Sequence, residues 1–200
     1  MRKAFLAGVM VLALAAPAFA GVGPGTMEKS LGGMFHLSPE PWELTGNMYL
    51  AYYVSPMVGI GPFFEIQKTG EMKDVVYWTG TDFDTGTYKP ATYYRFGGFV
   101  KVYLPVTMAG GKLTPYVAAG GGIVTMPKPQ WDDRLVEETE SKFGYFGEFS
   151  IDYWATDSWT IWAGLRVSKV SGDTDTYFDM YGRDFTDMRS QILVGISSFK

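Results

Sequence analysis

The sequence predicts an all-β fold, an eight-stranded antiparallel up-and-down transmembrane β-barrel. Three observations predict it. The N-terminus has the pattern of an export signal, the remaining chain has no apolar run long enough for a spanning helix, and eight segments alternate between apolar and polar residues. Aromatic residues make up 16% of the chain and glycines number 25, which favours strands and turns over helices.

The N-terminus has the three parts of a secretory signal peptide. Arg2 and Lys3 supply the positive start, an apolar run covers residues 4–16, and an Ala-x-Ala cleavage site follows at residues 18–20. A membrane anchor, the alternative, needs about 20 apolar residues in a row. The predicted division of the chain is a cleaved signal peptide over 1–20, a short periplasmic tail over 21–28 and the barrel over 29–200.

Eight segments have the length of membrane-crossing strands, for which about 9–11 tilted residues suffice. Pro62 and Pro115 fall inside two of them and remove ladder donors, so we expect a bulge or a shortened strand at each proline. The predicted strands cover residues 29–37, 44–54, 58–68, 92–104, 113–126, 143–154, 159–170 and 188–199.

The connections between these segments differ in length. Short turns are expected at Ser55–Met57, at 109–112 and at Ala155–Ser158, with a short connection near 38–42. Such turns typically lie on the periplasmic side of an outer-membrane barrel, opposite the longer loops, and an even strand count also places both termini there. The predicted long loops cover residues 69–91, 127–142 and 171–187.

Each predicted strand has one apolar face and one polar or small face. In the segment 92–104, for example, Phe96 and Val100 alternate with Arg95 and Lys101. A soluble sandwich or a lipocalin-type barrel would bury the apolar face. The membrane alternative is favoured because tyrosines stand near the ends of the apolar faces, as an interfacial aromatic belt requires; these are Tyr52, Tyr94, Tyr145 and Tyr153.

The segment Leu113–Gly122 resembles the Pro-Tyr-x-x-x-Gly-x-Gly strand of OmpA- and OmpX-like eight-stranded barrels. The stretch Gly147–Arg166 is similar to a two-strand hairpin around a short periplasmic turn in the same family. The resemblance implies an outer-membrane location and insertion by the barrel-assembly machinery, but no activity. The sequence departs from the family in one respect, because such barrels typically end on an aromatic residue, whereas here Phe199 is followed by Lys200. By alternation, Phe199 falls on the same strand face as Arg189 and Gln191.

Charged residues recur on the polar faces of the predicted strands. An eight-stranded barrel is only wide enough to be filled by side chains, so charges inside it must pair. We expect a plug of salt bridges, with a gated narrow channel as the alternative. The predicted lumen charges are Glu65, Arg95, Lys101, Glu148, Asp152, Arg166 and Arg189.

The sequence indicates no enzyme, catalytic residue, metal site or cofactor. His36 is the single histidine, so a multi-histidine metal site is excluded, and cysteine is absent. A lipid hydrolase using His36 and Ser38, oriented by Glu40 or Glu43, is the enzymatic alternative, although no known motif surrounds these residues. The net charge of −4 argues against nucleic-acid binding.

The expected partners are outer-membrane lipid and lipopolysaccharide. The predicted loops are rich in acidic and aromatic residues, which solvate the surface, bind cations that bridge to lipopolysaccharide phosphates, or contact an extracellular partner. The sequence thus predicts a largely closed outer-membrane barrel with a role in envelope integrity or surface interaction. A narrow solute or ion channel, a lipid-modifying enzyme and a soluble lipocalin-like binder are the alternatives.

Overall fold

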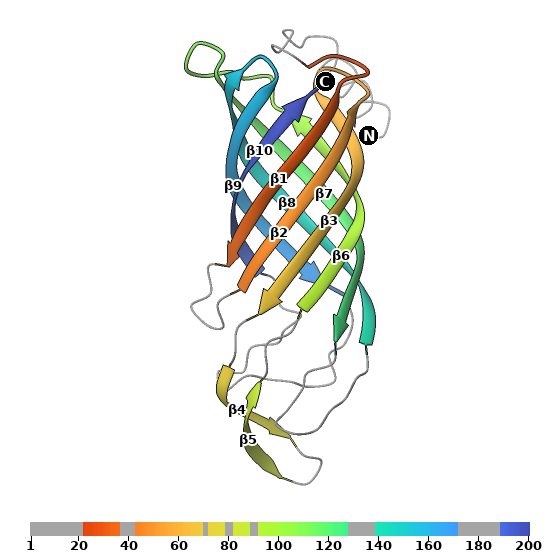
Figure 1. Cartoon of the computed structure of the whole chain (residues 1–200), viewed down its shortest axis with the longest axis vertical. Helices are drawn as coiled ribbons and strands as arrows, with labels where there is room; N and C mark the ends of the chain where they lie inside the picture. The colour runs from red at the N-terminus through yellow and green to blue at the C-terminus, as the bar shows by residue number, and fades with distance from the viewer. Residues whose placement is uncertain are drawn as a thin grey trace, which may run out of the picture.

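The computed structural model describes residues 22–36, 43–69, 72–78, 82–88, 92–127, 139–171 and 189–200. Eight strands form a closed barrel in which every neighbouring pair is antiparallel (Figure 1). Their order around the barrel is β1-β10-β9-β8-β7-β6-β3-β2. The barrel strands are β1 (Met27–His36), β2 (Glu43–Tyr53), β3 (Val58–Thr69), β6 (Thr92–Tyr103), β7 (Leu113–Pro127), β8 (Thr139–Thr156), β9 (Trp159–Val170) and β10 (Arg189–Phe199).

The predicted eight-stranded antiparallel barrel is confirmed. Seven strands begin and end within two residues of their predicted limits. The exception is β8, which begins four residues early because its pairing with β7 continues to Pro127 and Thr139. The predicted signal peptide, residues 1–20, lies outside the described residues, as do most of the predicted loops 127–142 and 171–187. No helix within the described ranges is long and apolar enough to cross a membrane.

The expected loop over residues 69–91 contains two further strands. β4 (Met72–Trp78) and β5 (Phe83–Tyr88) pair as an antiparallel hairpin beyond one end of the barrel (Figure 1). We call that end the loop end, and the opposite end, where β2 and β3 are joined by a short turn and the C-terminus lies, the turn end. Treating 69–91 only as a loop was therefore wrong.

Neither proline produces the expected bulge or shortened strand. The pairing of β2 with β3 passes from Tyr49–Phe63 to Tyr52–Ile60 without a change of register, so Pro62 interrupts the ladder only locally. Pro115 faces Ile151 within a continuous register. The last strand also keeps its register to Phe199, whose buried ring points into the barrel as its parity predicts.

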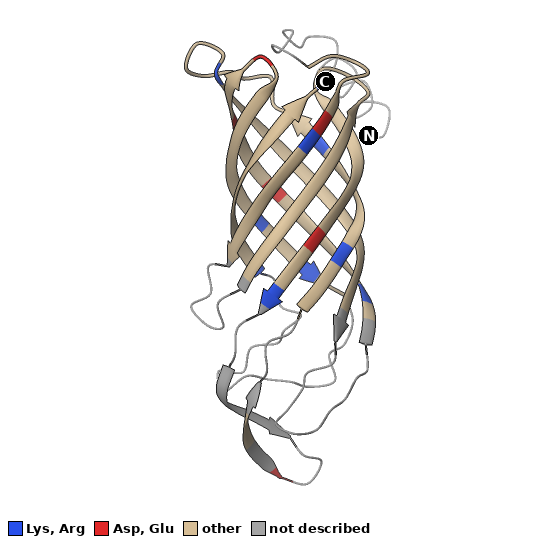
Figure 2. Ribbon diagram, viewed as in Figure 1, with Lys and Arg blue, Asp and Glu red and all other residues tan. Residues whose placement is uncertain are grey.

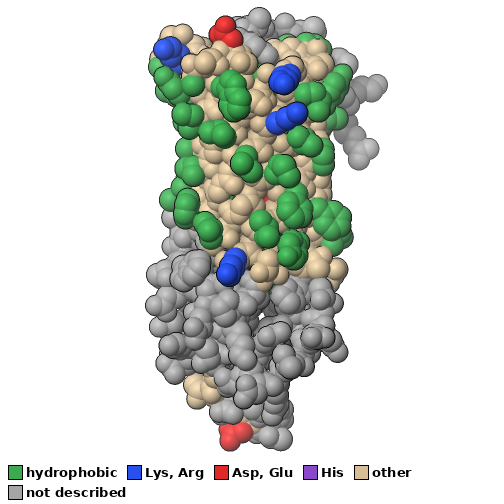
Figure 3. Space-filling view, in the orientation of Figure 1, with side chains coloured by type: hydrophobic (Ala, Val, Ile, Leu, Met, Phe, Trp, Pro, Cys, Tyr) green, Lys and Arg blue, Asp and Glu red, His purple; other side chains and the backbone are tan. Residues whose placement is uncertain are grey.

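The outer wall of the barrel is apolar. Leu31, Ile161 and Leu165 on this wall are 61%, 53% and 56% exposed. Figure 3 shows apolar side chains spread over the barrel face in view, with basic side chains near its ends. A water-facing surface rarely carries so large an apolar area. The soluble lipocalin-type alternative, in which the apolar faces line the interior, is therefore wrong.

Trp162 occupies the lumen against two glycines. It is 2% exposed, and a Cβ on Gly32 or Gly195 would lie 2.5 or 2.3 Å from its ring. The same Cβ positions approach the backbone oxygens of Val194 and Leu31 to 2.6 and 2.5 Å. Glycine at positions 32 and 195 therefore leaves the space that the indole ring occupies beside β1 and β10.

We expect Gly32→Ala to destabilise the folded barrel by about 1–3 kcal/mol, since the added methyl group overpacks a site closed by both a ring and backbone. Urea unfolding in detergent, followed by tryptophan fluorescence, measures the change. Gly33→Ala is the matched control, because its Cβ meets only the Thr45 oxygen at 3.6 Å. Equal stability of the two variants would contradict the packing described for Trp162.

Candidate functional site: a charged lumen

The strands carry charged residues at several heights of the barrel (Figure 2), and those on the inward faces are buried or half-buried. These charges follow directly from the alternation of strand side chains, because closure of the sheet turns one parity of every strand inward. They form two clusters that border one small cavity and both contact Tyr116. We call them the turn-end cluster, centred on Lys101, and the central cluster, centred on Arg166.

In the turn-end cluster one lysine serves two carboxylates. The Lys101 ammonium donates to Glu28 Oε1 at 3.0 Å and to Asp152 Oδ2 at 3.1 Å. The Tyr53 hydroxyl donates to Glu28 Oε2 at 2.6 Å, and the Tyr103 hydroxyl donates to Asp152. Lys101 also lies 4.0 Å from the centroid of the Tyr116 ring. The cluster thus joins β1, β2, β6, β7 and β8 across the lumen.

In the central cluster one arginine serves two glutamates. Arg166 donates to Glu148 Oε2 at 2.7 Å and to Glu65 Oε1. Arg95 adds a second cation 3.5 Å from Glu65 Oε2. The Arg166 guanidinium also lies 3.8 Å from the centroid of the Phe146 ring. These contacts join β3, β6, β8 and β9.

Hydroxyl groups also donate hydrogen bonds to the carboxylates of the central cluster. Glu148 Oε1 accepts from Tyr116 at 3.0 Å and from Ser150 at 2.9 Å, and Tyr49 donates to Glu65 at 3.2 Å. These hydrogen bonds offset part of the cost of burying the ion pairs, although Arg166 Nε and Asp152 Oδ1 have no hydrogen-bond partner among the described residues. The central cluster thus sets two cations against two carboxylates, whereas the turn-end cluster sets one lysine against two carboxylates.

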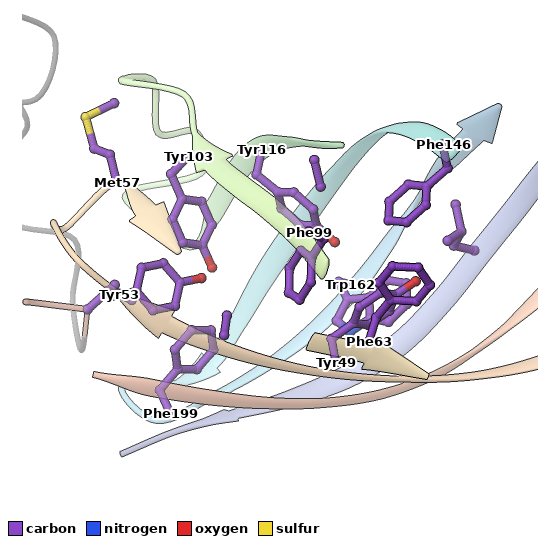
Figure 4. Packing of buried hydrophobic residues seen from close by; sticks show 14 of the residues in the cluster. Tyr49, Tyr53, Met57, Phe63, Phe99, Tyr103, Tyr116, Phe146, Trp162 and Phe199 are labelled. Carbon is purple, nitrogen blue, oxygen red and sulfur yellow. The ribbon is translucent and has the colours of Figure 1, made fainter. Parts of the chain in front are cut away.

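Aromatic rings fill the space around the two clusters. The centroid of Tyr49 lies 5.2 Å from that of Phe99, and Phe63 and Phe146 meet edge to face at 5.3 Å. Figure 4 shows these rings converging on the interior from different strands. At the turn end, Phe199 packs 4.8 Å from Trp154. Rings and ion pairs together fill much of the described lumen.

The cavity between the clusters has a volume of about 20 Å³. Its lining includes Glu28, Ser30 and Lys101 together with Tyr116 and Glu148. That volume holds about one water molecule, and the polar lining offers it several partners. The two clusters therefore border a common cavity with room for about one water molecule.

Six of the seven predicted lumen charges take part in these clusters: Glu65, Arg95, Lys101, Glu148, Asp152 and Arg166. Arg189 lies on the inward face at the start of β10, half-buried and nearer the loop end. The described residues contain no group of three or more Asp, Glu, His or Cys placed to hold a metal ion. His36 ends β1, and its side chain lies outside the described residues, as do Ser38 and Glu40.

The sequence interpretation missed Glu28. Residues 21–28 were assigned to the tail, whereas β1 begins at Met27 and Glu28 is 3% exposed in the lumen. The alternation of Glu28, Ser30 and Gly32 with Lys29 and Leu31 was the available signal. The tyrosines that bind the carboxylates were also missed, because tyrosine occurs on both faces of the barrel.

We expect Lys101→Met to destabilise the barrel by about 3–5 kcal/mol, because two buried carboxylates lose their shared cation. The midpoint of urea unfolding measures the loss. In the triple variant Lys101→Met, Glu28→Gln, Asp152→Asn no charge remains at the site, and most of the stability should return. If the single and triple variants were equally unstable, the packing of the lysine stem rather than its charge would be the important contribution.

Two solved structures place this architecture among known proteins. No protein-family model and no curated protein sequence matches the chain. The N-terminal β-barrel domain of Pseudomonas aeruginosa OprF superposes with a TM-score of 0.52 at 12% identity, covering 89% of this chain and 99% of that one. Neisserial surface protein A superposes with a TM-score of 0.57 at 11% identity, covering 86% and 95%. At such low identity the similarity concerns the fold alone, and this chain has the closed eight-stranded fold of the small OmpA/OmpX-like outer-membrane barrels.

Proposed function

We propose that the chain is exported through its N-terminal signal and resides in the outer membrane as a largely closed barrel. Its role is in envelope integrity or surface interaction rather than in transport or catalysis. Two features support the membrane location. The outer wall is apolar, and the closed barrel exposes no unpaired strand edge to lipid. The similarity of fold to outer-membrane barrels also favours this location.

The filled lumen is the observation that carries the proposed role. Arg166 has no exposed surface on its side chain, and Lys101 is 4% exposed, so both cations block the interior. Passage of a hydrated ion would require breaking buried ion pairs, each of which is costly to separate. A barrel closed in this way serves as a membrane anchor for the segments that it displays.

The displayed segments lie at the loop end. The β4–β5 hairpin extends beyond the barrel wall there (Figure 1). If the short turns face the periplasm, as in outer-membrane barrels generally, this hairpin faces the cell exterior. The proposed surface interaction is therefore assigned to the hairpin and its neighbouring loops.

Planar-bilayer recording tests the closed lumen. We expect the purified barrel to insert without producing conductance steps, because the two clusters and the aromatic rings block the path. The folded state of the inserted protein is verified by comparing the electrophoretic mobility of heated and unheated samples, which should differ. Regular conductance steps from the unmodified protein would contradict the proposal.

A narrow channel is the second candidate, and the cavity between the clusters favours it. This space is lined by Glu28 and Lys101 of the turn-end cluster and by Glu148 of the central cluster, as a step in a conduction path would be. If the barrel conducts, Arg95→Ala should change the conductance, since Arg95 lies towards the loop end of the central cluster. A lipid-modifying enzyme centred on His36 stays a hypothesis from the sequence.

A further inference from the structure

Lysine is the only charged residue type on the outer barrel wall within the described ranges. Every acidic side chain described on the barrel strands points inward, as do Arg95, Arg166 and Arg189. The outward lysines lie near the two ends of the wall. They are Lys29 and Lys200 at the turn end and Lys68 and Lys169 at the loop end.

Lys29 and Lys200 lie together, whereas the loop-end lysines lie apart. Met27 and Lys200 exchange backbone hydrogen bonds of 2.7 and 2.9 Å, and Lys29 faces Ser198 in the same β1–β10 ladder. The two lysines are thus diagonal neighbours on one face of the sheet, with Cα atoms about 7–8 Å apart. Lys68 on β3 and Lys169 on β9 are separated by three intervening strands in either direction around the barrel.

The lysine pair, Lys29 and Lys200, is flanked by amphipathic groups. Ser198 faces Trp159 across β9 and β10, and Met27 faces Tyr52 across β1 and β2. Trp159 is 50% exposed and Tyr52 is 48% exposed. Indole and phenol side chains favour the headgroup level of a bilayer, where the apolar ring meets lipid and the polar atom meets water.

Apolar surface continues from the lysine pair towards the middle of the wall. Leu31 follows Lys29 on β1 and is directly opposite Ile196 on β10. These side chains are 61% and 47% exposed. A ligand with a negative headgroup and hydrocarbon chains therefore finds both complements in one strip, two ammonium groups at the rim and an aliphatic surface beside them.

We propose that the lysine pair binds the phosphate of an anionic glycerophospholipid in the leaflet at the turn end. The phosphate oxygens accept hydrogen bonds from the Lys29 and Lys200 ammonium groups, and the Ser198 hydroxyl lies on the same row. The acyl chains lie along Leu31 and Ile196. A zwitterionic lipid binds less well, because its own ammonium or choline group offsets the attraction of the phosphate.

The lipid site rests on the membrane location proposed above. Lysines near a membrane surface attract anionic lipid, with an effect of roughly fivefold in affinity for each residue. The pair is therefore expected to give a preference on the order of tenfold or more for phosphatidylglycerol over phosphatidylcholine. The loop-end lysines, which lie apart, should not contribute to this site.

The test uses the folded barrel in nanodiscs that contain equal amounts of phosphatidylglycerol and phosphatidylcholine. Native mass spectrometry after stepwise removal of lipid counts the molecules of each lipid retained. We expect the unmodified protein to keep phosphatidylglycerol preferentially. Lys29→Gln, Lys200→Gln should reduce that preference about tenfold or more, whereas Lys68→Gln, Lys169→Gln, with the same loss of charge, should retain it.

Equal retention of both lipids by the unmodified protein would overturn the lipid site. An equal loss of preference in the two double variants would also overturn it, because a general charge effect would then explain the binding. Neither outcome affects the membrane location, which fails separately if the protein does not insert into nanodiscs at all. Insertion is scored by the heat-dependent mobility of the same samples.

Discussion

Closure of the sheet between β1 and β10 is the constraint on which the rest of the structure depends. That ladder runs from Glu28–Phe199 to His36–Gln191 without a shift of register. It therefore pairs the backbone N–H and C=O groups of the first and last strands, which would find no partner in a bilayer. Closure also assigns each residue to lipid or lumen. Because strand side chains alternate, a slip of one residue on β1 would exchange Glu28 for Lys29 in the lumen.

The charges in the lumen are a second consequence of closing the barrel. A wall that admits few charges to lipid must direct the others inward, where each needs a partner. Lys101 and Glu28 are 73 residues apart in the chain, and Arg166 and Glu65 are 101 apart. Their contacts connect strands that share no ladder, so the ion pairs cross-link the barrel through its interior. The clusters thereby fill part of the lumen and hold its shape.

The alternation of side chains in the sequence predicted which residues face inward and which face outward. It did not predict which inward residues contact each other across the barrel. Alternation placed Arg95 and Lys101 inward and Phe96 and Val100 outward, as the structure shows. It could not say that Lys101 joins Glu28 and Asp152, because partners across a lumen depend on strand tilt and on closure. The bulges expected at Pro62 and Pro115 were wrong, since each strand carries its proline in a continuous register.

The central claim is that the outer wall faces lipid while the lumen is sealed. Because the chain has no cysteine, single cysteines along β9 can carry nitroxide labels for accessibility measurements in bilayers. Oxygen, which concentrates in lipid, should reach labels at Ile161, Ala163 and Leu165, while labels at Thr160 and Ser168 stay inaccessible to both oxygen and a water-soluble nickel complex. High accessibility of the outward labels to the nickel complex would contradict the claim.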